Sequence, residues 1–441
     1  MSSSFKVQTF GCKVNTYDTG LLQKRLHQAG FISDPEKPSV HILNTCAVTA
    51  EATKEALKQA RRLKSKNPLA TVVLTGCAAQ VDGDLIDKAP GVDLIVANSH
   101  KGELEEILKK YFLGEIKTKV FRSNIFRNEK LGEGGGEETS HTRSYLKIQD
   151  GCNSFCTFCV IPYARGKSRS LPVNLIIEKI KDLEKKSVKE VVLTGVHIGD
   201  YCDEDSFGGP YKLDDLVEQV LRNTKIPRIR LTSLEPIELT EKLMDLFENP
   251  KMCPHFHMSL QSLSSPVLKA MKRKYGSQEV GDSLKWISEK FPQAFIGLDV
   301  ITGFPGETEE LFLETVENLK KWPWTRIHVF PYSERSGTRA AIMEGSVPVH
   351  IRKERAKVLR ELSLERYDLK AADQVGLVKS VITLKSPQGV TKSLSDDYWD
   401  VLIKDDIERS PGEELFVKIV GYERSQKDRV NGFLVGVLQN A

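Results

Sequence analysis

The sequence contains no run of about 18 consecutive apolar residues, so we expect no membrane-spanning helix. Its first residues, MSSSFKVQTF, contain neither the apolar segment nor the cleavage site of a secretory signal, so we expect a cytoplasmic protein. The net charge is only +4, which permits a nucleic-acid partner without indicating one. The chain of 441 residues has eight cysteines, of which six fall in patterned positions, and in a cytoplasmic protein such cysteines favour metal binding or catalysis over disulfide bonds.

The hydrophobic pattern divides the chain into three folded parts and one linker. Residues 3–115 alternate short apolar runs with amphipathic helical patterns, which predicts a parallel α/β domain. Residues 116–140 include the polar, glycine-rich stretch LGEGGGEETS and are expected to form a linker. Residues 141–370 contain six further strand and helix repeats, too few for a closed eight-unit barrel but suited to a partial (β/α)6 barrel. Residues 371–441 contain four strand-like runs joined by turns and predict a small all-β barrel.

Three cysteines occur within eight residues of the stretch YLKIQDGCNSFCTFCVIPYARG: Cys152, Cys156 and Cys159. This C-x3-C-x2-C spacing on a loop after a strand suits a cluster-binding turn. Half of a zinc site and a set of buried thiols are the alternatives. Three thiolates on a four-iron cluster leave one iron open for a substrate, as a catalytic metal requires.

Three more cysteines each follow a predicted strand of the N-terminal part: Cys12, Cys46 and Cys77. The carboxyl ends of parallel strands lie at the same edge of a sheet, so the pattern alone can bring these distant thiols together. The alternative is that they are three small buried residues at strand ends.

The C-x3-C-x2-C motif resembles that of radical S-adenosylmethionine enzymes, and the whole arrangement resembles the methylthiotransferases of that group. The resemblance implies two [4Fe–4S] clusters, each with one open iron. The cluster at Cys152, Cys156 and Cys159 would cleave S-adenosyl-L-methionine to a 5′-deoxyadenosyl radical. An auxiliary cluster at Cys12, Cys46 and Cys77 would carry the sulfur that receives a methyl group. The C-terminal barrel would be a TRAM domain, which binds tRNA in this family.

Short motifs resemble one branch of this family. GCKVN (11–15), KIQDGC (147–152) and IPYARG (161–166) are similar to the branch that acts on N6-threonylcarbamoyladenosine in tRNA and forms its 2-methylthio derivative. The alternatives are isopentenyladenosine in tRNA or an aspartate of a ribosomal protein. A non-enzymatic iron–sulfur carrier is a further alternative, but two sets of only three cysteines argue against it.

Strand-end residues of the central part are candidates for binding S-adenosylmethionine, although such residues are also common as caps and turns. They are Gly195, Ser233, Glu235, Gln261, Asp299 and Gly303. Arg165 and Arg169, near Lys167, follow the radical cysteines and are expected to bind the substrate carboxylate, or else to contact phosphate or solvent. Cys253, His255 and His257 are expected to pack in the barrel rather than bind zinc, and Cys202 is expected to have no role.

The expected partners are a tRNA anticodon stem-loop and an electron donor of the flavodoxin or ferredoxin type, with the protein a monomer. Residues 371–441 count 9 Lys and Arg against 11 Asp and Glu, which is a poor footprint for RNA. Better basic candidates are MKRKY (271–275) and the segment 350–370, with 7 Lys and Arg against 4 Asp and Glu.

Overall fold

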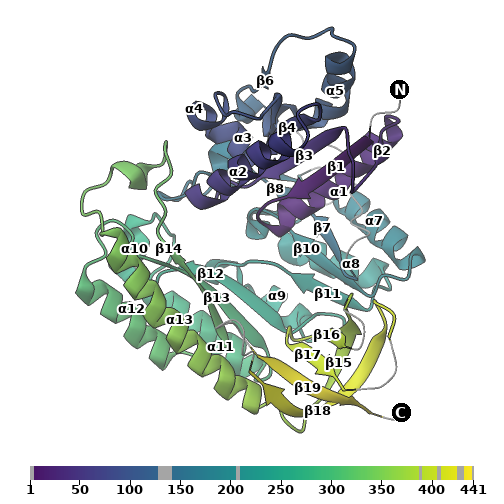
Figure 1. Cartoon of the computed structure of the whole chain (residues 1–441). Coiled ribbons are helices and arrows are strands. Elements are labelled where there is room, and N and C mark those ends of the chain that lie inside the picture. Colours follow the sequence, from purple (N-terminus) through teal and green to yellow (C-terminus); the bar gives the residue numbers. More distant parts are fainter. Residues whose placement is uncertain are drawn as a thin grey trace.

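The computed structural model describes residues 4–127, 142–204, 209–386, 390–404, 409–424 and 432–439. They form three units: an N-terminal domain (4–127), a central barrel (142–372) and a C-terminal barrel (378–439) (Figure 1). The glycine-rich residues 131–140 of the expected linker lie outside the described residues.

The N-terminal domain is built around one parallel sheet, as the sequence predicts. Its strand order is β2-β1-β3-β4-β5-β6. The strands are β1 Ser4–Thr9, β2 Ile32–Ser33, β3 Val40–Thr45, β4 Thr71–Gly76, β5 Leu94–Ala97 and β6 Val120–Phe121. The helices are α1 Lys13–Gln28, α2 Ala50–Lys66, α3 Cys77–Val81, α4 Gly83–Ile86 and α5 Leu104–Phe112, with 3-10 turns η1 Asn98–Glu103 and η2 Ile125–Arg127. Strand β6 falls inside the expected linker 116–140, so part of that segment extends the sheet.

The central barrel contains the six strands that the sequence predicts. They are β7 Ser144–Lys147, β10 Glu190–Thr194, β11 Arg228–Leu231, β12 His255–Gln261, β13 Phe295–Thr302 and β14 Arg326–Pro331. Strands β7, β10 and β11 form one parallel group and β12, β13 and β14 another. A parallel bridge between Leu234 and Met258 joins the groups, with Leu234 N donating to His257 O at 2.8 Å. The result is the predicted open (β/α)6 barrel.

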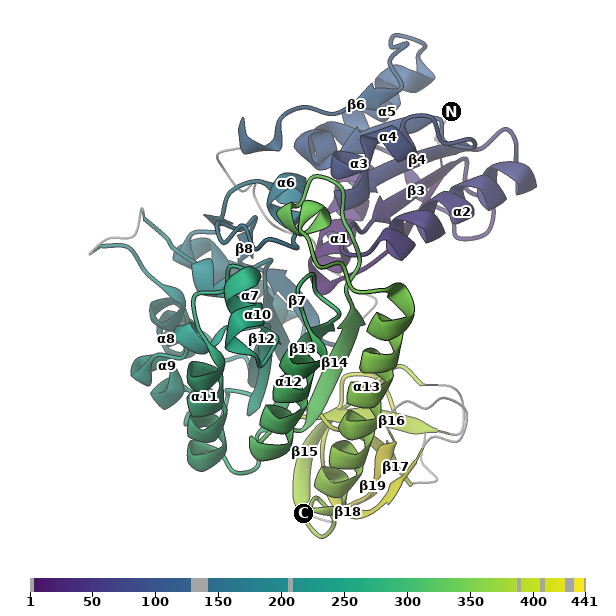
Figure 2. The ribbon, with the colours of Figure 1, turned by 90° about the vertical axis from the view of Figure 1, so that its left-hand side faces the viewer.

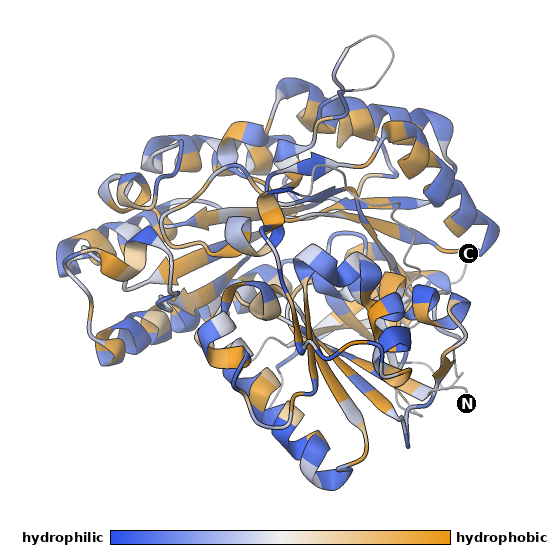
Figure 3. Ribbon diagram, turned by 90° about the horizontal axis from the view of Figure 1, so that it is seen from above, coloured by the Kyte–Doolittle hydropathy of each residue, from blue (hydrophilic) through white to orange (hydrophobic). Residues whose placement is uncertain are grey.

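Helices cover the outer face of this barrel (Figure 2). They are α7 Val173–Lys185, α8 Leu213–Asn223, α9 Glu241–Leu246, α10 Ser265–Ala270, α11 Ser277–Lys290, α12 Glu309–Lys321 and α13 Val349–Ala372. Shorter elements are β8 Gln149–Asp150, α6 Ile161–Arg165, β9 Arg169–Ser170, η3 Ile198–Asp200, η4 Pro236–Glu238 and η5 Arg339–Ile342. The outer helix faces are hydrophilic, whereas apolar residues follow the strands (Figure 3). None of the helices in the described parts of the chain has the length and apolar character needed to cross a membrane.

The C-terminal barrel is closed and has five strands in the order β15-β16-β17-β19-β18. They are β15 Val378–Thr383, β16 Thr391–Ser395, β17 Asp400–Ile403, β18 Glu414–Glu423 and β19 Phe433–Leu438. Strand β16 has the polar sequence TKSLS, which explains why its pattern did not predict a strand. Trp399 of this barrel packs against Phe295 of β13 and Tyr367 of α13, and so fixes the C-terminal barrel to the central one.

Arg165 joins the N-terminal domain to the central barrel, which corrects the expectation that it binds substrate. Its side chain is buried, with 3% of the residue exposed. Nη1 donates to both oxygens of Asp150 at 2.9 and 3.1 Å, and Nη2 donates to Asn15 at 2.6 Å and Asp18 at 3.1 Å. Nε donates to Cys77 Sγ at 3.3 Å. All five guanidinium N–H groups are therefore engaged, and none is available to a substrate carboxylate.

Two lysines complete this buried network. Lys147 Nζ contacts Asp18 at 2.5 Å and Asp150 at 2.9 Å, and Lys101 Nζ contacts Asp18 at 3.2 Å. Burial alone would raise the pKa of both carboxyl groups. For Asp18 the charges of Lys147, Lys101 and Arg165 outweigh burial, and for Asp150 those of Arg165 and Lys147 do, so both pKa values lie below 3.8. Three cations against two carboxylates leave one excess positive charge beside Cys77.

We predict that Arg165→Gln destabilises the contact between the two domains by about 3–5 kcal/mol, because it removes the guanidinium that Asp150 and Asp18 share and leaves buried acceptors without their donors. Thermal unfolding and hydrogen exchange of α1 and α6 would measure the loss. Because both carboxyl pKa values lie below 3.8, the stabilisation is present above that pH and is lost as the pH falls through the lowered values. The difference between variant and wild type should therefore shrink in acid.

Arg122→Gln is the matched control. Arg122 pairs with Asp87 at 2.7 Å within the N-terminal domain, where both side chains are partly exposed, so its loss should cost about 1 kcal/mol or less. Equal stability of the Arg165 and Arg122 variants at neutral pH would contradict the proposed role of the network.

Candidate metal centres

Cys12, Cys46 and Cys77 follow β1, β3 and β4, which are neighbours in the N-terminal sheet. The strand register aligns their ends, because Thr9 lies opposite Asn44 and Thr45 lies opposite Gly76. Burial raises the pKa of the Cys46 thiol, and the charges of Cys77 and Cys12 both raise it further, so the three thiols lie near one another. The fold therefore brings together three thiols whose successive positions are more than 30 residues apart in the sequence.

Two glycines allow these turns to approach each other. Gly11 has φ +97°, and a Cβ atom there would lie 2.6 Å from Cys46 Cβ. Gly76 has φ +94°, and a Cβ atom there would lie 2.4 Å from Thr45 O. Any larger residue would force the cysteine-bearing turns apart or strain the backbone.

The surroundings of this trio suit a thiolate-bound metal. Arg165 Nε and Asn98 Nδ2 lie 3.3 and 3.6 Å from Cys77 Sγ, and Val48 N lies 3.5 Å from Cys46 Sγ. Burial, with the charge of Cys77, raises the pKa of Cys46 to about 11, so this thiol keeps its proton until a metal displaces it. An all-thiolate donor set with a nearby excess positive charge fits an anionic iron–sulfur cluster.

Cys152, Cys156 and Cys159 lie on the loop between β8 and α6. Cys152 N donates to Gly166 O at 3.1 Å, and Cys159 N donates to Cys156 O at 3.0 Å. Gly151 has φ +78°, and a Cβ atom there would lie 2.0 Å from Lys167 O, so only glycine permits this entry to the loop. Burial, together with the charges of Cys156 and Cys152, raises the pKa of Cys159 to about 12. The three thiols thus share one turn, as the spacing predicts.

Polar side chains from the barrel reach this second trio. Arg273 Nη1 donates to Cys156 Sγ at 3.3 Å and its Nη2 pairs with Glu235 at 2.9 Å. His197 Nδ1 lies 3.7 Å from Cys152 Sγ, while its Nε2 lies 2.5 Å from Glu238 and 3.3 Å from Glu235. Burial alone would lower the pKa of His197, but hydrogen bonds with Asp200, Cys152 and Glu238 raise it far more.

Sequence reasoning missed the contacts of Arg273 and His197. Arg273 belongs to MKRKY, which was expected to face RNA, yet its side chain is only 5% exposed and points to the cysteines. His197 lies two residues after Gly195, which was the residue of this turn expected at an S-adenosylmethionine site. The position of each directly after a strand or helix of the barrel is the signal that could have indicated an inward role.

A cavity of about 250 Å³ lies between the two trios. Val48 and Thr49, which follow Cys46, form one wall. The loop that carries Cys152, Cys156 and Cys159, called the radical loop below, forms another through Cys159. The full lining comprises Val48, Thr49, Phe158, Cys159, Val160, Ile161, Gln261, Asp299, Ile301, Phe330, Pro331, Tyr332 and Ser333. A molecule in this cavity would touch residues of both cysteine loops.

Three of the six residues expected at an S-adenosylmethionine site lie near this cavity or the radical trio. Gln261 and Asp299 line the cavity, and Glu235 pairs with Arg273 beside Cys156. Gln261 has φ +71°, an unusual backbone conformation for a residue other than glycine. Such strain is common where a fold holds a side chain for a function.

The other three expected residues are Gly195, Ser233 and Gly303, and the two glycines are closely surrounded by other protein groups. Gly195 follows β10, and a Cβ atom there would lie 2.8 Å from Gln149 Oε1. Ser233 is half-buried just after β11. Gly303 N donates to Glu307 at 2.6 Å, and a Cβ atom there would lie 2.3 Å from Arg352 Cγ. These contacts account for both glycines without a ligand.

The remaining candidates are also placed. Arg169 Nη2 donates to Arg165 O at 2.7 Å, behind the buried network. His255 stacks on Tyr398 at 4.1 Å, and His257 pairs with Asp299 at 2.9 Å. Cys253 is buried, and its Sγ lies 4.0 Å from Glu190 Oε2. Cys202 Sγ lies 3.3 Å from Lys212 Nζ, and Cys202 N donates to Ser170 Oγ at 2.9 Å.

Comparisons with known proteins agree with this geometry. The Radical SAM superfamily matches residues 146–319, and the Uncharacterized protein family UPF0004 matches residues 4–97. The first match spans the cysteine loop and five of the barrel strands, and the second spans the sheet that carries Cys12, Cys46 and Cys77.

Curated relatives match most of the chain. The threonylcarbamoyladenosine tRNA methylthiotransferase MtaB of Aquifex aeolicus is 40% identical, covering 81% of this chain and 87% of the relative. MtaB of Bacillus subtilis is 37% identical, covering 80% and 79%. The tRNA-2-methylthio-N(6)-dimethylallyladenosine synthase of Thermodesulfovibrio yellowstonii is 32% identical, covering 95% and 96%.

A solved structure confirms the fold. The radical S-adenosylmethionine methyltransferase TsrM of Kitasatospora setae aligns with a TM-score of 0.60 and 15% identity, covering 78% of this chain and 77% of that one. At that identity the likeness concerns the fold alone. The cysteine loop in a partial barrel, the second trio on its own sheet and the identity to relatives over most of the chain show that this protein belongs to the radical S-adenosylmethionine methylthiotransferase family.

Proposed function

We propose that this enzyme is a tRNA methylthiotransferase that converts N6-threonylcarbamoyladenosine beside the anticodon to its 2-methylthio derivative. The observation that carries the proposal is the cavity that contacts both cysteine loops. A base held there would lie next to Cys159 of the radical loop and next to Val48 and Thr49, which follow the auxiliary cysteine Cys46. The names of the relatives in Aquifex aeolicus and Bacillus subtilis support the same substrate.

We infer two [4Fe–4S] clusters, one for each trio, since each trio supplies three of the four ligands that such a cluster takes. When bound, the clusters would supply S-adenosylmethionine cleavage at one site and sulfur transfer at the other. Arg273 would donate to the Cys156 thiolate and Arg165 to the Cys77 thiolate. Gln261 and Asp299 would offer polar contacts to S-adenosylmethionine or the base.

The target C–H bond lies on an aromatic ring and has no acidic proton for a side chain to remove, which is why radical chemistry suits it. The base must leave its stack, and an anticodon loop lowers that cost because its bases are already exposed. Exposed basic residues on α13, namely Lys353, Lys357 and Arg360, would contact the phosphates. Arg352 and Arg355 of the same helix are buried and would not. We also propose that the enzyme is a monomer and receives its electrons from a donor of the flavodoxin or ferredoxin type.

One observation favours the isopentenyladenosine branch as a second candidate. The cavity lining is mostly apolar, with Val48, Phe158, Ile301 and Phe330 among its residues. An isopentenyl group is apolar and would fit such walls, and the relative in Thermodesulfovibrio yellowstonii carries a name from that branch.

We predict that anaerobically reconstituted protein binds about eight irons and that the triple variant of Cys152, Cys156 and Cys159 to Ala binds about four. Iron and sulfide analysis would measure both. Cys202→Ala is the matched control and should keep the full iron content, because Cys202 lies with neither trio. A triple variant that keeps all of the iron would show that this trio is not a cluster site.

We predict that replacing Cys12, Cys46 and Cys77 by alanine abolishes methylthiolation but leaves S-adenosylmethionine cleavage, because cleavage needs only the other trio. Chromatography of 5′-deoxyadenosine and of modified nucleosides would separate the two activities. A folded variant that forms no 5′-deoxyadenosine would refute this division.

We predict that the enzyme modifies an anticodon stem-loop carrying N6-threonylcarbamoyladenosine at least tenfold faster than the same loop carrying adenosine or isopentenyladenosine. Nucleoside mass spectrometry on the three RNAs measures the ratio. Faster turnover of the isopentenyl RNA would assign the enzyme to the other branch. Modification of ribosomal protein in place of any of these RNAs would overturn a tRNA substrate.

A further inference from the structure

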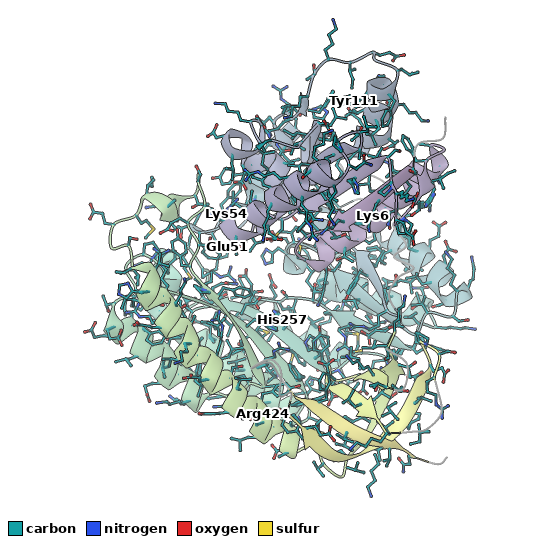
Figure 4. All side chains as sticks on the ribbon, viewed as in Figure 1. Lys6, Glu51, Lys54, Tyr111, His257 and Arg424 are labelled. Carbon is teal, nitrogen blue, oxygen red and sulfur yellow. The ribbon has the colours of Figure 1, made fainter. Side chains whose placement is uncertain are left out.

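Polar and charged side chains line the lumen of the central barrel next to the apolar part of the cavity. Strand register places Asp299 opposite His328, and Gly297 opposite both His257 and Arg326. Alternate residues of a strand face the same side, so Ile301 at the cavity, Asp299 and Gly297 descend one lumen face at intervals of roughly 6–7 Å. His257 lies on the side of the barrel that faces the N-terminal domain (Figure 4).

Gly297 leaves room in this row. A Cβ atom there would lie 3.4 Å from His257 Nδ1, so Gly297 leaves space for about one methyl group in contact with that ring. Asp299 belongs to the cavity lining and also pairs with His257, so the polar row and the cavity adjoin. A ligand in the cavity can therefore extend a short polar group toward this row.

Cations from the N-terminal domain and the barrel meet at the aromatic ring of Tyr398, which comes from the C-terminal barrel. Lys13 Nζ lies 5.8 Å from its centroid, and the guanidinium carbons of Arg143 and Arg230 lie at 5.9 and 4.9 Å. Tyr398 stacks on His255, which begins β12, whereas Gln261 at the other end of that strand lines the cavity.

Lys13 differs from the other cations in having no acidic partner. Arg230 and Arg143 share Glu190, at 2.8 and 3.3 Å, and Asp299 pairs with His257. Within the described residues, Lys13 makes no ion pair or hydrogen bond through its ammonium group, and its recorded contact is the face of Tyr398. Asp400 also faces Tyr398, but burial raises its pKa despite Arg326 and Arg143 nearby.

Positive charges act on the side chains that surround Lys13. Burial alone would raise the pKa of Tyr398, yet Lys13, Arg143 and Arg230 hold it below 10. Burial, then the charges of Arg326, His257 and Lys13, lowers the pKa of His328 to about 4. The cations around Tyr398 thus favour negative charge at this position, whereas burial is the main cause of the shift at His328.

The lumen selects the kind of anion. Tyr398 and His255 lie at the strand end opposite the cavity, inside the ring of barrel strands, so an anion beside them is best supplied as a small terminal group of a molecule already in the cavity. A backbone phosphate of RNA belongs to a chain that continues on both sides and suits such an interior position less well. A carboxylate at the end of a base's side chain has the required shape and charge.

We propose that Lys13 is a specificity-determining residue that receives the carboxylate of the substrate's N6 side chain in the barrel lumen, and so distinguishes this substrate from an apolar isopentenyl base. The inference rests on the proposed function and replaces the expected role of Arg165, whose donors are all engaged. Lys13 lies directly after Cys12, so the anion would be held by the segment that carries an auxiliary ligand.

The test compares Lys13→Gln with Lys24→Gln, an exposed lysine of the same helix. Three stem-loops are used: one with N6-threonylcarbamoyladenosine, one with its carboxylate converted to a methyl ester, and one with adenosine. Fluorescence anisotropy gives Kd, nucleoside mass spectrometry gives kcat and KM, and iron analysis reports cluster loading.

Lys13→Gln should weaken binding and raise KM for the carboxylate RNA roughly tenfold or more, with Kd for the adenosine RNA and S-adenosylmethionine cleavage unchanged. Wild type should lose the same factor with the ester, and the variant should be indifferent to esterification. Lys24→Gln should match wild type throughout. If the Lys13→Gln variant loses iron, the ester RNA still tests the contact, because it removes the negative charge from the substrate and leaves the wild-type protein unchanged.

Two results would overturn the inference. One is a Lys13→Gln variant that retains the full preference for carboxylate over ester, and the other is a raised KM for S-adenosylmethionine in place of the RNA effect. The proposed function fails separately, if wild type itself does not distinguish the threonylcarbamoyl RNA from the adenosine RNA.

Discussion

The relative position of the two cysteine trios depends on the buried contacts of Arg165. This residue closes the short helix that follows the radical loop, and it donates to Asp150 of the barrel, to Asp18 of the N-terminal domain and to Cys77 itself. A guanidinium can hold these three groups at once because its five donors have fixed directions. Unpaired buried charges are costly, so an arrangement of the two domains in which each of these groups has a partner of opposite charge is strongly favoured. Distance between the trios is therefore set by an ion network rather than by apolar packing alone.

That constraint also explains where the cavity lies. Helix α6 and the radical loop are held against the strand ends of the N-terminal sheet, so Val48 and Thr49 face Cys159 across the cavity. The excess positive charge of the network lies beside Cys77, where thiolates bound to iron would bring negative charge. The same set of residues thus positions the domains and favours the charge state of an occupied cluster site.

Much of this architecture could be predicted from the sequence, because parallel strands and helices leave a strong periodic pattern. The six barrel strands, the sheet that gathers Cys12, Cys46 and Cys77, and the small C-terminal barrel followed from it. The two-residue β6 and the polar β16 leave almost no pattern and were missed. Arg165 was misassigned for a different reason. Its partners Asn15 and Asp18 lie about 150 residues away, and no local pattern indicates which distant carboxylates will meet a given cation. Arg273 and His197 were missed on the same ground, since an inward and an outward basic residue look alike in sequence.

The apolar cavity and the cationic lumen divide recognition between them. Walls such as Phe158, Ile301 and Phe330 can hold a flat base of either branch, and they discriminate weakly because apolar contacts tolerate many shapes. A single ammonium at the end of the lumen discriminates more strongly, because an apolar side chain would leave it desolvated without a partner. Lysine suits this position, since its flexible stem lets one point charge follow a small carboxylate, whereas arginine prefers two fixed contacts. Holding that carboxylate from the residue after Cys12 would fix the base relative to the auxiliary trio, so the choice of substrate and the placement of the reacting carbon would depend on the same short turn.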